Sequence, residues 1–182
     1  LRNSSAASDV YKRQVINSFN EDQLKLIIKI LGEERDASRI ARNIVKTRLQ
    51  KRISRVDELV KIIEKSKKKN FFAKINPSTK TFQALRIFVN KEITELINGI
   101  VNATKILKPG GKILIVSFHS IEDKSVKFFF SNFSKSKSNP SRYLPANQND
   151  NQTLFEKYAN KIVKPSQSEL KKNKPSRSAK LR

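Results

Sequence analysis

The sequence predicts an α/β fold in which an all-helical segment precedes part of a doubly wound parallel sheet. Residues 15–66 carry apolar side chains at helical spacing and contain no strand-like run. Residues 112–118 (KILIVSF) are short, β-branched and almost wholly apolar, and they follow the turn Pro109-Gly110-Gly111. This composition is typical of a strand that is buried on both faces, as in a parallel sheet covered by helices.

Three helices are predicted in the first part of the chain. Asn20, with Gln23 three positions on, is a capping box that opens a helix ending near Gly32. The next apolar-periodic stretch runs over residues 37–49. Ser54 and Asp57 are predicted to cap the third helix.

The opening residues 1–14 are polar and lack periodicity. They also lack the apolar stretch of a signal peptide. We interpret them as a non-native or disordered leader and leave them out of the fold prediction.

The second part of the chain alternates helix and strand. A helix is predicted to open at Pro77 and to continue or restart until residue 107. After the strand at 112–118, Ser120 and Asp123 are predicted to cap another helix.

The C-terminal third is predicted to contain less regular structure. Residues 134–153 are rich in Ser, Lys, Asn and Pro and are predicted to form a mobile loop. Two final strands are predicted at 155–163 and 178–181, and residues 164–182 form a basic tail. The predicted domains are a helical, RNA-binding subdomain at 15–70 and a sheet-containing domain at 71–182.

The charge of the chain points to a polyanionic partner. Lys and Arg number 39 against 16 Asp and Glu, which gives a formal net charge of +23 in 182 residues. Nucleic acid is the commonest partner for such a surface. A solvated basic surface with no specific ligand and a membrane surface are the alternatives, although no apolar run has the roughly 18 residues of a membrane span. The absence of cysteine excludes disulfides and Cys nucleophiles, and the single histidine argues against a His-rich metal site.

The polar cluster after the apolar strand is the first candidate site. Its members are His119, Ser120, Glu122 and Asp123. Ligands of open parallel sheets bind beyond the carboxyl ends of the strands, where the next helix begins. The cluster is therefore a candidate pocket rim, with His119 and Asp123 as possible proton acceptors. The alternative is that the cluster only caps a helix.

Basic and polar surfaces form the second candidate site. Residues 76–86 crowd polar groups at a helix start, for which ordinary capping is the plainer interpretation. One face of the second predicted helix and the tail concentrate cations that suit phosphate groups. The candidate RNA-binding residues are Arg35, Arg39, Arg42, Lys46, Thr79, Lys80, Thr81, Gln83, Arg86, Arg177, Lys180 and Arg182.

Several motifs together resemble one known family. They are Thr81-Phe82-Gln83-Ala84-Leu85-Arg86-Ile87, Val89-Asn90, Pro109-Gly110-Gly111, Ser117-Phe118-His119-Ser120, Glu122-Asp123 and Arg177-Ser178-Ala179-Lys180-Leu181-Arg182. In this order they resemble the ribosomal RNA small subunit methyltransferase H family. One departure is Asn76, where that family usually has a histidine, and it casts doubt on any role for position 76.

The resemblance implies the C-terminal half of a Rossmann-like class I methyltransferase with a helical insertion. It implies transfer of a methyl group from S-adenosyl-L-methionine to N4 of a cytidine in 16S rRNA of the small ribosomal subunit. It also implies a cytoplasmic protein of bacterial type, with an organellar source as the alternative. The family's glycine-rich cofactor region has no counterpart among the four glycines here, so no cofactor-binding residue is assigned and the fragment alone is expected to be inactive.

Two other interpretations of the chain stay open. The first is a non-catalytic basic RNA-binding protein associated with the ribosome. The second is a truncated product that does not fold stably, because a parallel strand at 112–118 needs sheet neighbours.

Overall fold

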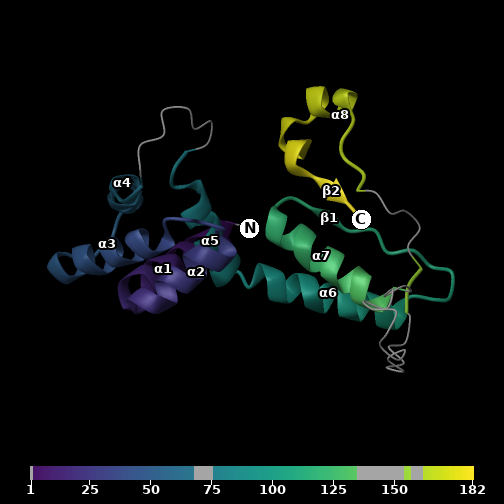
Figure 1. The fold of residues 1–182 in the computed structure, drawn as a ribbon, viewed down its shortest axis with the longest axis horizontal. Coiled ribbons are helices and arrows are strands. Elements are labelled where there is room, and N and C mark those ends of the chain that lie inside the picture. The colour runs from purple at the N-terminus through teal and green to yellow at the C-terminus, as the bar shows by residue number, and fades with distance from the viewer. Residues whose placement is uncertain (1, 68–75, 135–153, 157–161) are drawn as a thin grey trace, which may run out of the picture. The chain divides into compact units, whose positions relative to one another are not determined.

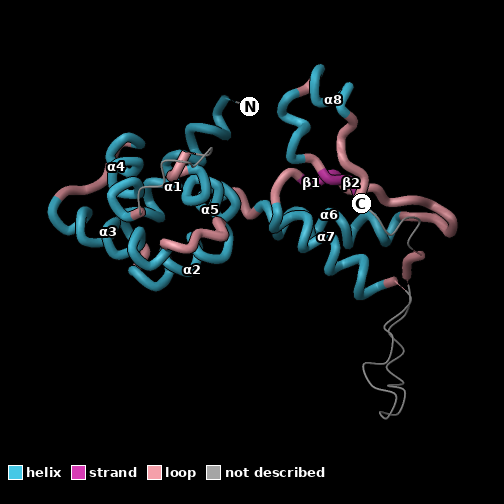
Figure 2. Tube along the Cα trace, turned by 45° about the horizontal axis from the view of Figure 1, so that its top comes forward, coloured by secondary structure: helices cyan, strands magenta, loops and turns pink. Residues whose placement is uncertain are grey.

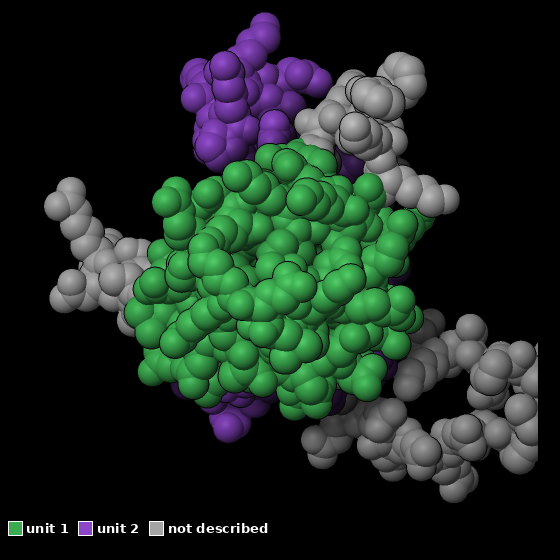
Figure 3. Space-filling view, turned by 90° about the vertical axis from the view of Figure 1, so that its left-hand side faces the viewer, with its two compact units in different colours: residues 1–92 green, residues 93–182 purple. Residues whose placement is uncertain are grey.

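The computed structural model describes residues 2–67, 76–134, 154–156 and 162–182. These residues are mostly helical, with one small two-stranded sheet (Figures 1 and 2). The chain divides into two compact units, unit 1 at 1–92 and unit 2 at 93–182, which Figure 3 colours separately. No helix among the described residues has the length and apolar character needed to cross a membrane.

Unit 1 is built from five helices within its described residues. They are α1 (Arg2–Ser18), α2 (Glu21–Leu31), α3 (Ala37–Gln50), α4 (Val56–Ser66) and α5 (Thr79–Val89). The three helices predicted between residues 20 and 66 are α2, α3 and α4. The predicted leader at 1–14 is helical from Arg2 onward, as the first part of α1.

The core of unit 1 lies where α2 packs against α3 and α5. Leu24, Ile28, Ile40 and Ile44 are completely buried there. Each such side chain stabilises the fold by about 1.5–3 kcal/mol relative to an exposed position. The boundary was predicted at residue 70, but α5 packs on α2, so the compact unit extends to Glu92.

Of the two helix caps predicted between residues 20 and 66, the structure confirms one. Asn20 caps α2 in a complete capping box with Gln23, as predicted. The prediction for α4 was wrong, because its N-cap residue is Arg55. The Glu58 carboxylate accepts hydrogen bonds from the backbone N–H groups of Ser54 and Arg55, at 3.0 and 3.1 Å.

Unit 2 combines helices with the small sheet. Its elements are α6 (Glu92–Ile106, which begins at the last residue of unit 1), β1 (Val116–Ser117), α7 (Ser120–Phe133), α8 (Gln167–Lys172), the 3₁₀ helix η1 (Lys174–Ser178) and β2 (Lys180–Leu181). Helices α6 and α7 run alongside each other in both ribbon and tube views. Ile100 of α6 and Val126 of α7 are buried.

The predicted parallel strand at 112–118 is corrected by the structure. Only β1 is a strand within these residues, and it pairs antiparallel with β2. Leu114, Val116 and Phe118 are 64%, 53% and 56% exposed, so this segment is not buried on both faces. The described part of the chain offers it no parallel partner, and the C-terminal strand takes the only pairing available.

The final strands are shorter than predicted. β2 lies within the predicted strand 178–181. In the predicted strand 155–163, Phe155 and Val163 form isolated bridges, and residues 157–161 lie outside the described residues. Most of the predicted loop, residues 135–153, also lies outside them, while Ser134 pairs with Phe155.

Candidate functional site

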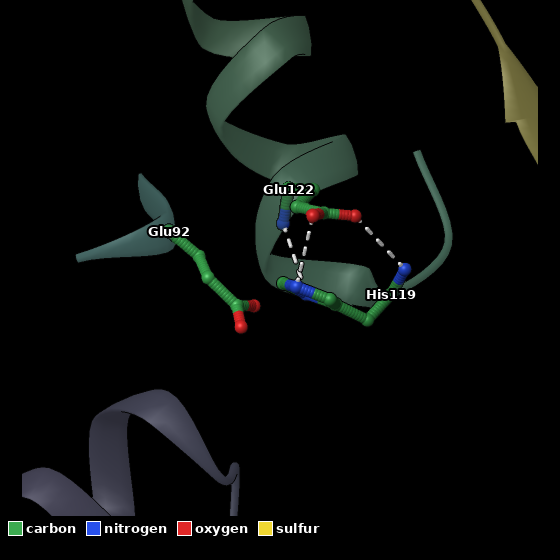
Figure 4. A group of neighbouring side chains, drawn as sticks. All are labelled: Glu92, His119 and Glu122. Atoms are coloured by element: carbon green, nitrogen blue, oxygen red, sulfur yellow. Dashed lines mark hydrogen bonds and ion pairs between the residues drawn. The ribbon is translucent and has the colours of Figure 1, made fainter. Parts of the chain in front are cut away.

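The polar cluster at the start of α7 is organised by His119. His119 is the N-cap of α7, a role that we predicted for Ser120 and Asp123. Its Nδ1 accepts a hydrogen bond from the N–H of Glu122 at 3.3 Å, and the Glu122 carboxylate accepts from the N–H groups of Phe118 and His119 at 2.9 and 3.4 Å. Figure 4 shows the resulting reciprocal contact between the two side chains. Ser120, half-buried, is the first residue of the helix.

The capping contact sets the tautomer of the imidazole. Because Nδ1 accepts a hydrogen bond, a neutral His119 carries its proton on Nε2. This nitrogen lies 3.2 Å from the Glu122 carboxylate. In this arrangement Nδ1 takes part in the helix cap and Nε2 faces the Glu122 carboxylate.

Asp123 is held by the C-terminal end of the chain. Arg182 Nε donates to its Oδ1 at 2.6 Å, and Lys180 Nζ donates to its Oδ2 at 3.2 Å. The side chain of Asp123 is 10% exposed. The Arg182 guanidinium, followed by Lys180, holds the pKa of the Asp123 carboxyl below its ordinary value despite the opposing effect of burial. Asp123 is therefore a weak proton acceptor in this arrangement.

The structure thus unites residues that the sequence assigned to two different sites. Lys180 and Arg182 were candidate RNA contacts, and Asp123 was a candidate catalytic residue. The structure brings the three together in unit 2 through the pairing of β1 with β2.

The polar residues of α5 are only partly available at the surface. Thr79, Lys80 and Arg86 are exposed, while Thr81 is completely buried and its hydroxyl makes no hydrogen bond. The prediction of RNA contact is corrected for Thr81, because solvent does not reach this position. Arg86 fits a structural role at this helix better than an RNA contact, since its Nε lies 2.9 Å from the Glu92 carboxylate.

The remaining predicted contacts around α5 are local. Lys80 donates to the Glu33 carbonyl at 3.1 Å, and Gln83 is half-buried. Asn76 accepts from the backbone N–H and the hydroxyl of Ser78 at 2.9 and 2.5 Å, so this side chain organises the turn before α5.

The basic face of α3 is exposed as predicted. Arg39, Arg42 and Lys46 of α3 reach solvent, as does Arg35, which lies two residues before the helix. Arg39 pairs with Asp36, and Arg42 lies 3.6 Å from Glu21. Arg35 and Lys46 make no ion pair with the described residues.

Sequence reasoning missed a second basic group in unit 1. A shallow groove of about 370 Å³ is lined by Gln14, Asn17, Ser18, Arg48 and Arg52. Arg48 donates to the Ile16 carbonyl at 2.7 Å, and Arg52 is exposed. The spacing of Arg48 and Arg52, four residues apart at the end of a predicted helix, was the available signal.

Comparison with known sequences agrees with the resemblance. The sequence model of the MraW methylase family matches residues 4–182. A Bartonella henselae protein named ribosomal RNA small subunit methyltransferase H is 46% identical over 168 residues, which cover 92% of this chain and 48% of the relative. Proteins of the same name from Ehrlichia canis and Hyphomonas neptunium are 40% and 39% identical, over 98% and 92% of this chain and 57% and 49% of their own lengths.

The chain spans about half the length of the curated relatives that it matches. The family match nevertheless covers both compact units, including the helix cap at His119 and the C-terminal strand. The chain therefore belongs to the MraW methylase family.

Proposed function

We propose that this chain acts as part of a methyltransferase that modifies ribosomal RNA of the small subunit. The observation that carries the proposal is the similarity, over nearly the whole chain, to proteins named for that activity. We further propose that S-adenosyl-L-methionine is the methyl donor and that N4 of a cytidine in 16S rRNA is the acceptor.

In architectural terms, we propose that unit 2 completes a class I methyltransferase sheet and that unit 1 is its helical insertion. Three features support this assignment. Unit 1 contains only helices among its described residues, and β1 leads directly into the N-terminus of α7. The exposed apolar side chains of 114–118 suit a segment against which other parts of the proposed sheet domain would pack.

The described residues do not fit the methyl donor. A nucleotide-type cofactor needs a loop after a strand where the backbone approaches closely, usually with glycines. Gly110 and Gly111 come before β1, and Gly110 serves a turn with a positive φ of 81°. The donor supplies an electrophilic methyl group on a sulfonium. We assign its binding to the half of the relatives that this chain does not cover.

The residues of this chain are proposed to handle the RNA. A cytosine amine is a weak nucleophile, so the enzyme must unstack the base and orient N4. We place the His119–Asp123 turn at the rim of that pocket, where the cap holds the α7 N-terminus rigid and its N–H groups favour a phosphate. The basic face of α3, with Arg48 and Arg52, is proposed to bind the RNA backbone.

A chimera tests the proposal. The half of the Bartonella henselae relative that this chain does not cover is joined to residues 15–182 of this chain. Methyl transfer from labelled donor to unmodified small subunits is then measured, and mass spectrometry locates the modified nucleotide. We expect one methyl group on N4 of one cytidine, and the intact relative serves as the positive control. A folded chimera that transfers no methyl group, or that modifies a different class of atom, would refute the proposed chemistry.

The large positive charge favours a second candidate, a non-catalytic protein that binds ribosomal RNA. The same chimera separates the two. Tight binding to small-subunit RNA without methyl transfer would support this second function.

A further inference from the structure

The C-terminal strand is the centre of the small sheet in unit 2. Leu181 pairs with Val116 on one side and with Val163 on the other. Arg182 and Ile115 exchange two backbone hydrogen bonds of 3.0 and 2.8 Å, which extend the ladder by one residue. The last residues of this chain are therefore built into the fold of unit 2.

The side chains of this strand reach the first turn of α7. Arg182 and Lys180 place three hydrogen bonds on the two carboxylate oxygens of Asp123, with lengths of 2.6, 3.2 and 3.3 Å. The exposed fractions of the Arg182, Lys180 and Asp123 side chains are 19%, 34% and 10%. A carboxylate this buried needs cationic partners, and hydrogen bonds to charged groups are the stronger kind.

These contacts bracket the candidate pocket rim. Upstream of His119, β2 pairs with Val116 and Ser117, and the Ser117 hydroxyl donates to the Lys180 carbonyl at 3.4 Å. Downstream of Glu122, the same strand holds Asp123. The five residues between Ser117 and Asp123, which include the His119–Glu122 cap, are thus fixed at both ends by the C-terminal strand.

We propose that Asp123 is a positioning residue that clasps the C-terminal strand to α7 and thereby sets the His119–Glu122 turn. Lys180 and Arg182 serve this clasp, and the RNA contacts of the tail come from its exposed cations. These are Lys164, Lys171, Lys172, Lys174 and Arg177. The clasp itself stands on unit 2 alone, and only its consequence for RNA rests on the proposed function.

Amide hydrogen exchange on this chain tests the clasp. Asp123→Asn leaves both cations without their charged acceptor, so exchange at Ile115, Leu181, Arg182 and Glu122 is expected to rise by about tenfold or more. The exchange rates of amides in α2 and α3, which belong to unit 1, should not change. Arg182→Lys keeps the charge but loses the two-pronged geometry, so an intermediate effect is expected. Lys171→Met, an exposed tail variant, is the matched control.

The double variant Asp123→Asn with Arg182→Met tests whether the two residues act together. This comparison remains valid if the single variants lose part of their structure. If the two residues form one clasp, the effect of the pair on exchange is smaller than the product of the single effects. Independent, multiplicative effects, or unchanged exchange in Asp123→Asn, would overturn the proposal.

Binding to a small-subunit rRNA fragment at several salt concentrations tests whether the exposed tail cations contact RNA while Lys180 and Arg182 do not. The salt slope is the magnitude of the slope of the logarithm of the binding constant against the logarithm of the salt concentration. Lys171→Met and Lys174→Met should each reduce this slope by about 0.7, as expected for a lost phosphate contact to a single strand. Lys180→Met and Arg182→Met should raise exchange in β2 while leaving the slope unchanged. A reduced slope with unchanged exchange would assign these two cations to RNA and overturn the clasp. A wild-type chain that binds no RNA would refute the RNA proposal, and the exchange experiment would still decide the clasp.

Discussion

At the residue scale, Asp123 joins α7 to the C-terminal strand through its two cationic partners. The Arg182 guanidinium and then Lys180 lower its pKa in the folded protein, while in an unfolded chain the value is about 3.9. A carboxyl with a depressed folded pKa stabilises the fold above its unfolded pKa and loses this effect as pH falls through the folded value. The contribution of Asp123 is therefore complete at neutral pH.

We predict that β2 loosens only in acid. The amide chemical shifts of Ile115 and Leu181 should stay constant down to about pH 4 and then drift toward unstructured values as Asp123 is protonated. In Asp123→Asn, these amide chemical shifts should be displaced toward unstructured values already at neutral pH, and acid should cause no further transition. A wild-type transition centred above the ordinary carboxyl range would contradict the direction of the pKa shift.

Glu58 is the second carboxylate whose environment decides its protonation. The N–H groups of Ser54 and Arg55, with Lys51, lower its pKa to about 2. Its stabilising effect should therefore be complete above about pH 4.3 and should disappear toward pH 2.

Glu58→Ala is predicted to lower the thermal midpoint of the helical signal at pH 7, because two N–H groups of the α4 N-terminus lose their acceptor. The difference from wild type should narrow as the pH approaches 2, as measured by circular dichroism. Glu64→Ala, at an exposed position of the same helix, is the control and should have little effect at either pH.

At the element scale, the end of α2 depends on a close approach to α5. A Cβ at Gly32 would lie 2.6 Å from the Ile28 carbonyl oxygen and 2.7 Å from that of Lys80. Both are backbone atoms, and because Lys80 belongs to α5, the two helices would have to separate to admit a side chain.

Gly32→Ala is predicted to destabilise unit 1 by about 1–3 kcal/mol, the usual cost of forcing extra volume into a packed contact. Gly99→Ala is the matched control, since no atom lies within 4 Å of a Cβ at this exposed position in α6. It should stabilise its helix by about 0.5–1 kcal/mol, because alanine loses less backbone entropy than glycine. Denaturant titration followed by circular dichroism measures both changes, and equal effects of the two substitutions would contradict the packing argument.

At the scale of the whole molecule, the net charge of +23 dominates long-range behaviour. Some of the exposed cations are already neutralised by neighbouring acids, as Arg39 is by Asp36. Cations without such a neighbour release more counterions when RNA binds, so they should contribute more to the salt dependence.

We therefore predict that Arg35→Met and Lys46→Met in unit 1 each lower the salt slope of binding to small-subunit rRNA by about 0.7. Arg39→Met should lower the slope less, because the charge of Arg39 is already balanced by Asp36. Lys127→Met, an exposed lysine of α7 outside the predicted basic surfaces, is the control. Equal slopes for all four variants would mean that the α3 face does not bind the RNA.

The sequence by itself determined helices α2 to α7 and one of their caps, whereas it predicted neither α1 nor α8. The capping box of Asn20 and Gln23 and the apolar spacing of α3 were readable because their hydrogen bonds and contacts join residues within about one turn. The family was readable too, because its motifs are local strings such as Ser117-Phe118-His119-Ser120.

Tertiary structure alone decided the pairing of strands and the partners of the charged groups. The apolar run at 112–118 suggested a buried parallel strand, but β1 pairs with β2, some sixty residues later in the chain. Likewise, Asp123 carries no local sign that Lys180 and Arg182 will be its partners. Strand pairing and ion pairs depend on which distant groups the folded chain brings within about 3 Å, and a local pattern does not contain that information.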